Sequence, residues 1–204
     1  MRETDVKPFR KQPYDIMSRG MARTFQNIRL FKSETVYNNV LTACHAEADY
    51  NIFQSLWRLK AGPRWLTKYY YQEKALREKT EELLKIMGIW EQRDMIAVNL
   101  PYGQQRKLEI ARALATDPKL LLLDEPAAGM NSQEKKELVN TIRKIRDTYH
   151  LAVLLVEHDM ELVMGISENI TVINFGRPIA CGTAEEIQNN NDVIEAYLGR
   201  SDDE

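Results

Sequence analysis

The residues from Leu120 to Pro126 read LLLLDEP, so a run of four leucines leads directly into two adjacent carboxylates, Asp124 and Glu125. Ionised carboxylates at the end of an apolar run lose solvation unless a cation or hydrogen-bond donors lie opposite them. A buried strand that ends in two acids suits a magnesium–nucleotide site, in which one carboxylate holds the metal and the next deprotonates an attacking water. An Asp-Glu pair on its own is more often two solvated acids at a strand end. The neighbouring residues therefore decide between this interpretation and a nucleotide site.

Two segments near LLLLDEP favour the nucleotide interpretation. The upstream run LPYGQQRKLEIARAL, residues 100–114, contains Gly103, which lets the backbone approach a phosphate where a helix begins. The start of that helix presents free N–H groups and the positive end of the helix dipole to an anion. Downstream, VEHD places His158 after the next apolar run, where it can donate a hydrogen bond to a γ-phosphate or its attacking water. A lone histidine there is more often structural, so the interpretation depends on all three segments.

The apolar patterns predict a parallel sheet that would bring these residues together. The runs KLLLLDE (119–125) and LAVLLVE (151–157) are short and uniformly apolar, which predicts strands that are buried on both faces. ITVINFG (170–176) alternates more and predicts a third, parallel strand nearer an edge. Ligands bind at the carboxyl ends of the strands in such sheets, and both acids and His158 fall at those ends.

Helical patterns surround the predicted strands. Residues 72–88 have a helical apolar period that stops at Gly88, and residues 132–147 form a second such pattern. Between the first helices, residues 50–71 mix aromatic and basic side chains around a Gly-Pro break, which indicates a surface excursion. The expected N-terminal caps of the later helices are Asn131 with Glu134, Asp159, Thr183 with Glu186, and Asp192 with Glu195.

Composition narrows the class of protein. The 204 residues are 44% hydrophobic and 28% charged, which is typical of a soluble globular protein, and a net charge of −2 predicts no nucleic-acid partner. Cys44 and Cys181 lie far apart and suggest reduced thiols. No apolar segment approaches the roughly 20 residues that span a bilayer, and the N-terminus lacks a signal-peptide pattern. We therefore expect a cytoplasmic chain whose membrane association depends on a partner.

Five segments, in order, resemble the motifs of the ATP-binding subunit of an ABC transporter. The segments are RTFQNIRLF (23–31) for the Q-loop, LPYGQ for the signature usually written LSGGQ, LLLLDEP for the Walker B strand, AAGMN (127–131) for the D-loop, and VEHD for the switch-histidine loop. The resemblance covers essentially the whole chain. It implies an α/β fold, a P-loop NTPase (ABC ATPase) core with a parallel sheet that is incomplete at the N-terminus, plus a helical subdomain.

The resemblance also implies roles for individual residues, with ATP and Mg²⁺ as the cofactors. Glu125, His158 and Gln26 would be catalytic, Asp124 and Gln26 would hold the metal, and Tyr102, Gly103, Gln104 and Asn131 would contact nucleotide. Tyr102, Gly103 and Gln104 would cap the nucleotide of a facing subunit. The implied parts are residues 1–27 as a remnant of the N-terminal core ending in the Q-loop, 28–107 as the helical subdomain with the signature, 108–182 as the parallel-sheet core, and 183–204 as a helical tail.

Finer likeness points to high-affinity importers of branched-chain amino acids. The segments ARTFQNIRLF, YGQQRKLEIARAL, LDEPAAGMN, EHDMELVMGIS and the tail NNNDVIEAYLG all resemble one of the two ATPase subunits of those systems. The implied partners are transmembrane permease subunits, a second ABC ATPase subunit, identical or paralogous, and, indirectly, a substrate-binding protein. Such a chain would be peripheral on the inner face of the cell membrane. The amino acid carried does not follow from these residues.

Three departures from the family pattern leave alternatives open. Pro101 stands where the signature usually has Ser, Asn131 stands where the D-loop usually has Asp, and no GxxxxGK[ST] run occurs. That run supplies a lysine, a metal-binding hydroxyl and backbone donors for phosphate, so we expect this chain to be inactive as an ATPase on its own. One alternative is a truncated interaction fragment that keeps the signature and docking surfaces but does not hydrolyse ATP. Another is a soluble ABC-type ATPase of DNA repair or translation, which would need coiled-coil arms, duplicated cassettes or a basic face.

Overall fold

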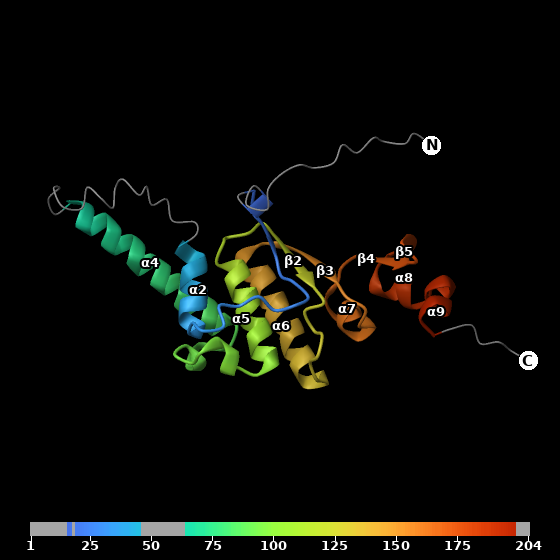
Figure 1. The fold of residues 1–204 in the computed structure, drawn as a ribbon. Coiled ribbons are helices and arrows are strands. Elements are labelled where there is room, and N and C mark those ends of the chain that lie inside the picture. The colour runs from blue at the N-terminus through green and yellow to red at the C-terminus, as the bar shows by residue number, and fades with distance from the viewer. Residues whose placement is uncertain (1–15, 18, 46–63, 199–204) are drawn as a thin grey trace, which may run out of the picture.

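The computed structural model describes residues 16–17, 19–45 and 64–198, which form both helices and strands (Figure 1). The strands are β1 (Met21–Arg23), β2 (Leu120–Asp124), β3 (Ala152–Val156), β4 (Ile170–Asn174) and β5 (Arg177–Gly182). The α-helices are α2 (Val36–His45), α4 (Arg64–Ile86), α5 (Tyr102–Leu114), α6 (Ser132–Tyr149), α7 (Met160–Ile166), α8 (Ala184–Gln188) and α9 (Asn191–Leu198), with short 3-10 helices η2 (Trp90–Gln92) and η3 (Ala97–Asn99). None of the helices described is both long and apolar enough to cross a membrane.

β2 is the middle strand of a three-stranded parallel sheet in the order β1-β2-β3. It pairs with β3 from Leu120 opposite Ala152 to Asp124 opposite Val156. The predicted parallel pairing of these two strands is confirmed. β1 was not predicted as a strand, because its three residues, MAR, are too few to show a period.

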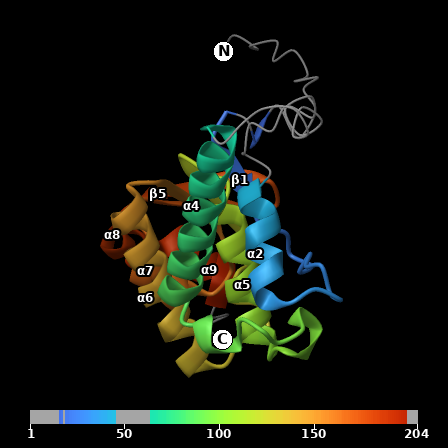
Figure 2. The same cartoon turned by 90° about the vertical axis from the view of Figure 1, so that its left-hand side faces the viewer.

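One face of this sheet belongs to the main core. Leu121 and Leu123 are fully buried there, and Figure 1 shows α5 and α6 below β2 and β3. The same apolar cluster includes Leu108 and Ile110 of α5, Leu138 and Ile142 of α6, Val40 of α2, and Leu83 and Leu84 of α4. Figure 2 shows α2, α4 and α5 side by side. The helices and the sheet therefore share a continuous core that fixes α5 relative to β2.

The other face of the sheet is partly open. Leu154 and Val156 of β3 are each 51% exposed, and Met21 of β1 is 38% exposed. The expectation that β3 is buried on both faces was wrong for this strand. A uniformly apolar run indicates that both faces can be covered, but it does not say which residues cover them.

The third predicted strand is also placed differently. β4 pairs antiparallel with β5 in a separate two-stranded sheet, so the prediction of a parallel strand beside the first two was wrong. Phe175 and Gly176, between the strands, have positive φ angles of 46° and 77°, as a tight hairpin turn requires. The alternation of buried Ile170 and Val172 with exposed neighbours fits an antiparallel strand that has one solvent-exposed face. These side chains form a second small core with Ile187 and Val193.

Most helix ends follow the predicted signals. Gly88 has φ +68° just after α4, and capping boxes form at Asn131 with Glu134 and at Thr183 with Glu186. The predicted cap Asp192 was wrong, because it lies in the first turn of α9 while Asn190 Oδ1 accepts from Val193 N at 3.2 Å. The expected excursion over 50–71 was wrong for its last residues, since α4 already begins at Arg64; residues 46–63 lie outside the described part.

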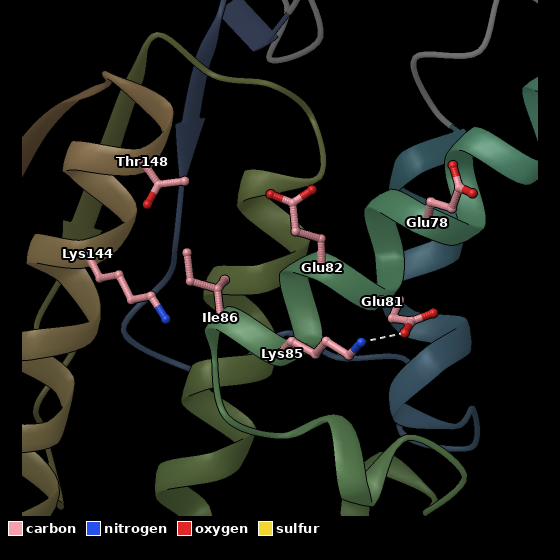
Figure 3. A pocket seen from close by; sticks show the side chains of 7 residues that line it. All are labelled: Glu78, Glu81, Glu82, Lys85, Ile86, Lys144 and Thr148. Atoms are coloured by element: carbon pink, nitrogen blue, oxygen red, sulfur yellow. Dashed lines mark hydrogen bonds and ion pairs between the residues drawn. The ribbon is translucent and has the colours of Figure 1, made fainter.

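A groove of about 560 Å³ lies between α4 and α6 (Figure 3). It is lined by Glu78, Glu81, Glu82, Lys85, Ile86, Lys144 and Thr148. The carboxylates are partly balanced by the lysines, and Lys85 Nζ donates to Glu81 at 2.6 Å. None of the residues that the sequence motifs single out lines this groove.

The open sheet face gives a first prediction. Replacing both Leu154 and Val156 with Thr should reduce binding of an apolar dye and self-association, because about half of each side chain faces solvent. The free energy of unfolding should change by no more than about 0.5 kcal/mol per site, since Thr also favours strands. Leu121→Ala on the buried face is the matched control and should cost about 2–5 kcal/mol. Equal losses of stability from both faces in urea unfolding would show that the outer face is covered.

Candidate functional site

Asp124 ends β2 next to a cation from β1. Arg23 Nη2 donates to Asp124 Oδ2 at 2.8 Å, and 23% of the Asp124 side chain is exposed. The Thr24 hydroxyl accepts the Asp124 backbone N–H at 3.4 Å. The positive charge needed opposite this acid is therefore Arg23, which sequence reasoning missed. The sequence feature that could have identified Arg23 was its position three residues before Gln26 in the Q-loop-like segment.

Glu125 is the residue at which the three predicted catalytic side chains meet. Gln26 Nε2 donates to Glu125 Oε2 at 2.9 Å, and His158 Nδ1 lies 3.7 Å from Glu125 Oε1. Glu125 has φ +44°, a left-handed conformation that is uncommon outside glycine. Its backbone N–H donates to Val156 O at 2.9 Å, which continues the β2–β3 pairing by one residue and holds this conformation. The strand end thus directs Glu125 toward Gln26 and His158.

Glu157 fixes the two loops that follow β2 and β3. Its side chain is 1% exposed; its Oε1 accepts from Ala127 N at 3.0 Å and its Oε2 accepts from His158 N at 3.2 Å. His158 itself has a side chain that is 72% exposed, so it can rotate toward a ligand while its backbone stays fixed. Sequence reasoning placed Glu157 at a strand end but gave it no role. The sequence feature that could have identified Glu157 was its position directly after an apolar run.

The residues predicted to face a second nucleotide lie at the start of α5. Tyr102 is 45% exposed and its ring packs against Gly129, where an added Cβ would lie 3.3 Å from Tyr102 Cε1. Gly103 lies close to the start of α6: a Cβ there would lie 2.9 Å from Glu134 Oε1, so a larger residue would displace the end of the Glu134 side chain. Gln104 is partly buried in the same turn. The signature-like segment therefore contacts both the D-loop-like residues and the start of α6.

Asn131 has a clear local role. Its Oδ1 accepts from Glu134 N at 2.9 Å, and Glu134 Oε2 accepts from Asn131 N at 2.9 Å. This capping box satisfies donors at the start of α6. The contact of Asn131 with nucleotide stays a prediction.

The donor set at the strand end suits Mg²⁺ with a phosphate ligand. Mg²⁺ prefers oxygen ligands and is usually held by one or two carboxylates together with water and substrate phosphates. Asp124 offers a second carboxylate oxygen beyond the one that Arg23 occupies, and Gln26 offers its side-chain carbonyl. Among the described residues no cluster of three His, Cys, Asp or Glu side chains could hold a metal alone. The residues present therefore fit a metal that arrives with phosphate.

The family model described as ABC transporter matches residues 2–128 of the sequence. This chain belongs to the ABC transporter family. A second model, described as branched-chain amino acid ATP-binding cassette transporter, matches residues 177–203. ABC ATP-binding proteins bind and hydrolyse ATP, and those of importers attach to membrane permeases.

Curated relatives and solved structures agree with this assignment. The chain is 47% identical to the high-affinity branched-chain amino acid transport ATP-binding protein LivG of Salmonella typhimurium, over 89% of this chain and 69% of LivG. It is 44% identical to BraF of Pseudomonas aeruginosa, a protein of the same description, over 92% of this chain and 71% of BraF. An ATP-binding cassette of an ABC transporter in its ADP conformation superposes with a TM-score of 0.72 at 27% identity, over 93% of this chain and 72% of that one. A nucleotide-free cassette gives a TM-score of 0.71 at 28% identity, over 93% and 73%.

The loop that carries His158 gives a pH prediction. Asp159 caps α7 by accepting from Leu162 N at 3.1 Å, and Lys135 of α6 donates to its other oxygen. The hydrogen bond from Lys135 lowers the pKa of Asp159 below its usual value. A lowered folded pKa contributes stability above the unfolded value of about 3.9, and this is lost as the pH falls through the folded pKa.

Lys135→Met should therefore reduce the free energy of unfolding at neutral pH and remove part of the acid dependence. Urea unfolding between about pH 7 and about pH 2 should show the two proteins converging at the acid end. Lys136→Met removes the same charge from the next position without the contact to Asp159, and should keep the wild-type pH dependence. A constant difference across that range would assign the effect of Lys135 to packing alone.

Proposed function

We propose that this chain is the ATP-binding subunit of an importer for branched-chain amino acids, and that its ATP site includes Glu125. The contact of Gln26 and His158 with one carboxylate, at 2.9 and 3.7 Å, is the observation that supports this most directly. The name of the LivG relative and the branched-chain model at residues 177–203 support the class of substrate.

Each residue at the strand end then has a distinct task. Bound Mg-ATP supplies the γ-phosphoryl group that is transferred to water. Glu125 accepts a proton from that water, Gln26 orients the Glu125 carboxylate through its amide, and His158 donates a hydrogen bond near the attacked phosphate. Asp124 would provide a carboxylate oxygen to the metal, and the Gln26 side-chain carbonyl would be a further ligand.

A second ATPase subunit completes the proposed assembly. Tyr102, Gly103 and Gln104 lie at the start of α5, and the 45% exposure of Tyr102 leaves its ring accessible to a facing chain. The free N–H groups of this helix start would meet the nucleotide of that chain. Permease subunits and, through them, a substrate-binding protein would complete the importer on the inner face of the membrane.

The role of Glu125 is tested in a version of the chain to which a segment with a GxxxxGK[ST] run has been fused. Glu125→Gln should lower ATP turnover by about 10²–10⁴-fold and should trap ATP in a stable dimer, because the amide keeps its size but accepts no proton. Glu137→Gln makes the same change at a side chain on α6 that is 52% exposed, and should leave turnover unchanged. Undiminished turnover in the Glu125 variant would show that another group is the general base, and His158 would be the next candidate.

The 204-residue chain by itself should bind ATP weakly and hydrolyse it very slowly. The sequence contains no GxxxxGK[ST] run, whose backbone and lysine donors make charge-assisted hydrogen bonds worth about 1.5–3 kcal/mol each. The loss of several such bonds weakens affinity by orders of magnitude. Titration calorimetry with Mg-ATP should therefore detect no micromolar binding. A micromolar dissociation constant would place the phosphate contacts on residues present here.

A further inference from the structure

Arg106 and Glu109 form a buried ion pair on α5 to which the sequence motifs give no role. Their side chains are 0% and 6% exposed, and Arg106 Nη1 lies 2.7 Å from Glu109 Oε2. Burying two charges costs solvation free energy, which is offset only where further hydrogen bonds use their remaining donors and acceptors. The partners of those groups therefore indicate what the pair does.

Those partners lie in one backbone segment, residues 25–29, which has no helix or strand of its own. Arg106 donates to Phe25 O at 2.6 Å and to Gln26 O at 2.8 Å. Glu109 Oε1 accepts from Phe25 N at 3.4 Å and from Arg29 N at 3.2 Å. The pair supplies donors to the carbonyls and an acceptor to the amides of the same segment, so it fixes the segment in position and in orientation.

The same guanidinium contacts the start of its own helix. Arg106 Nη2 lies 3.4 Å from the hydroxyl of Tyr102, whose ring packs against Gly129. On the other side, the Gln26 side chain donates to Glu125. Arg106 therefore lies between Tyr102 and the backbone of the residue that touches Glu125.

We propose that Arg106 and Glu109 are positioning residues that hold Gln26 against Glu125 and make that contact depend on the location of α5. The proposal rests on the proposed function in taking Glu125 as the base. A displacement of α5 carries the Phe25 and Gln26 carbonyls with it, and so moves the Gln26 amide relative to the Glu125 carboxylate. An event at Tyr102 is thereby transmitted to the base within one chain.

The planar fork of Arg106 is what this geometry requires. Two carbonyls and a carboxylate are reached by donors in fixed directions, which a lysine ammonium on a flexible stem does not reproduce. Arg106 Nε is buried without a hydrogen-bond partner in the described part of the chain, so the guanidinium retains an unpaired donor. Arg106→Lys removes this unpaired donor and keeps the positive charge opposite Glu109. The variant therefore separates the positioning of residues 25–29 from the stability of the fold.

The test is amide hydrogen exchange by NMR on the full 204-residue chain, without nucleotide. In Arg106→Lys, exchange at Phe25 N and Arg29 N should accelerate by about tenfold or more, while exchange in β2 at Leu121 and Leu123 stays unchanged. The side-chain NH₂ resonances of Gln26 should move toward those of a free amide. Lys107→Met changes the next residue of α5, whose partner is Glu137 at 3.3 Å, and should leave all these signals unchanged.

Unchanged exchange at residues 25 and 29 together with unchanged Gln26 resonances would overturn the proposal. Equal acceleration throughout β2 would also overturn it, because the pair would then only stabilise the fold. If Arg106→Lys does not fold, Glu109→Gln is judged by the same signals, since the amide keeps the shape of the side chain and removes the charge that pairs with Arg106. Because the experiment contains no ATP, loss of the proposed ATPase function would leave its outcome intact, and the two can fail separately.

Discussion

The parallel pairing of β2 with β3 determines where every acidic residue of the site lies. Asp124 is opposite Val156, so the next residues of the two strands, Glu125 and Glu157, leave the sheet at the same edge. The hydrogen bond from Glu125 N to Val156 O extends the pairing past the last regular residue and keeps Glu125 in its left-handed conformation. A shift of one residue would turn these side chains to the opposite face. The buried leucines of β2 prevent that shift, because it would place them on the open face.

Different partners stabilise the three carboxylates at this edge. Asp124 is paired with a guanidinium, Glu125 accepts from an amide, and the buried Glu157 accepts from backbone N–H groups. Each partner comes from a different segment, so the edge holds together β1, the segment after it, and the loops after β2 and β3. Charged and polar groups therefore connect these segments across the edge of the sheet.

Sequence patterns predicted the local features of each element well. They predicted less well which other elements would lie beside it. The LLLLDEP and VEHD runs predicted two parallel strands that end in acids, and the Asn131–Glu134 pattern predicted a capping box, since all of these depend on nearby residues. The hairpin of β4 with β5 was missed, because the turn at Phe175 and Gly176 lacks the usual Asn-Gly or Asp-Gly signal. Arg23 and Arg106 were missed for a related reason, because their partners are distant in the sequence. Arg23 lies 101 residues from Asp124, and Arg106 lies 81 residues from Phe25.

Arg23 neutralises one charge on Asp124, and this bears on which species the edge selects. A bare divalent cation must compete with a guanidinium already at 2.8 Å, so it gains less attraction than an unpaired carboxylate would offer. A bare anion would gain little from the same guanidinium, because the Arg23 charge is already paired with Asp124. Under the proposed function, a complex of cation and phosphate would let the two ions exchange partners: the Asp124 carboxylate would pass to the metal and Arg23 to a phosphate oxygen. Under that function, the Arg23–Asp124 pair would favour the complex over either of its ions alone.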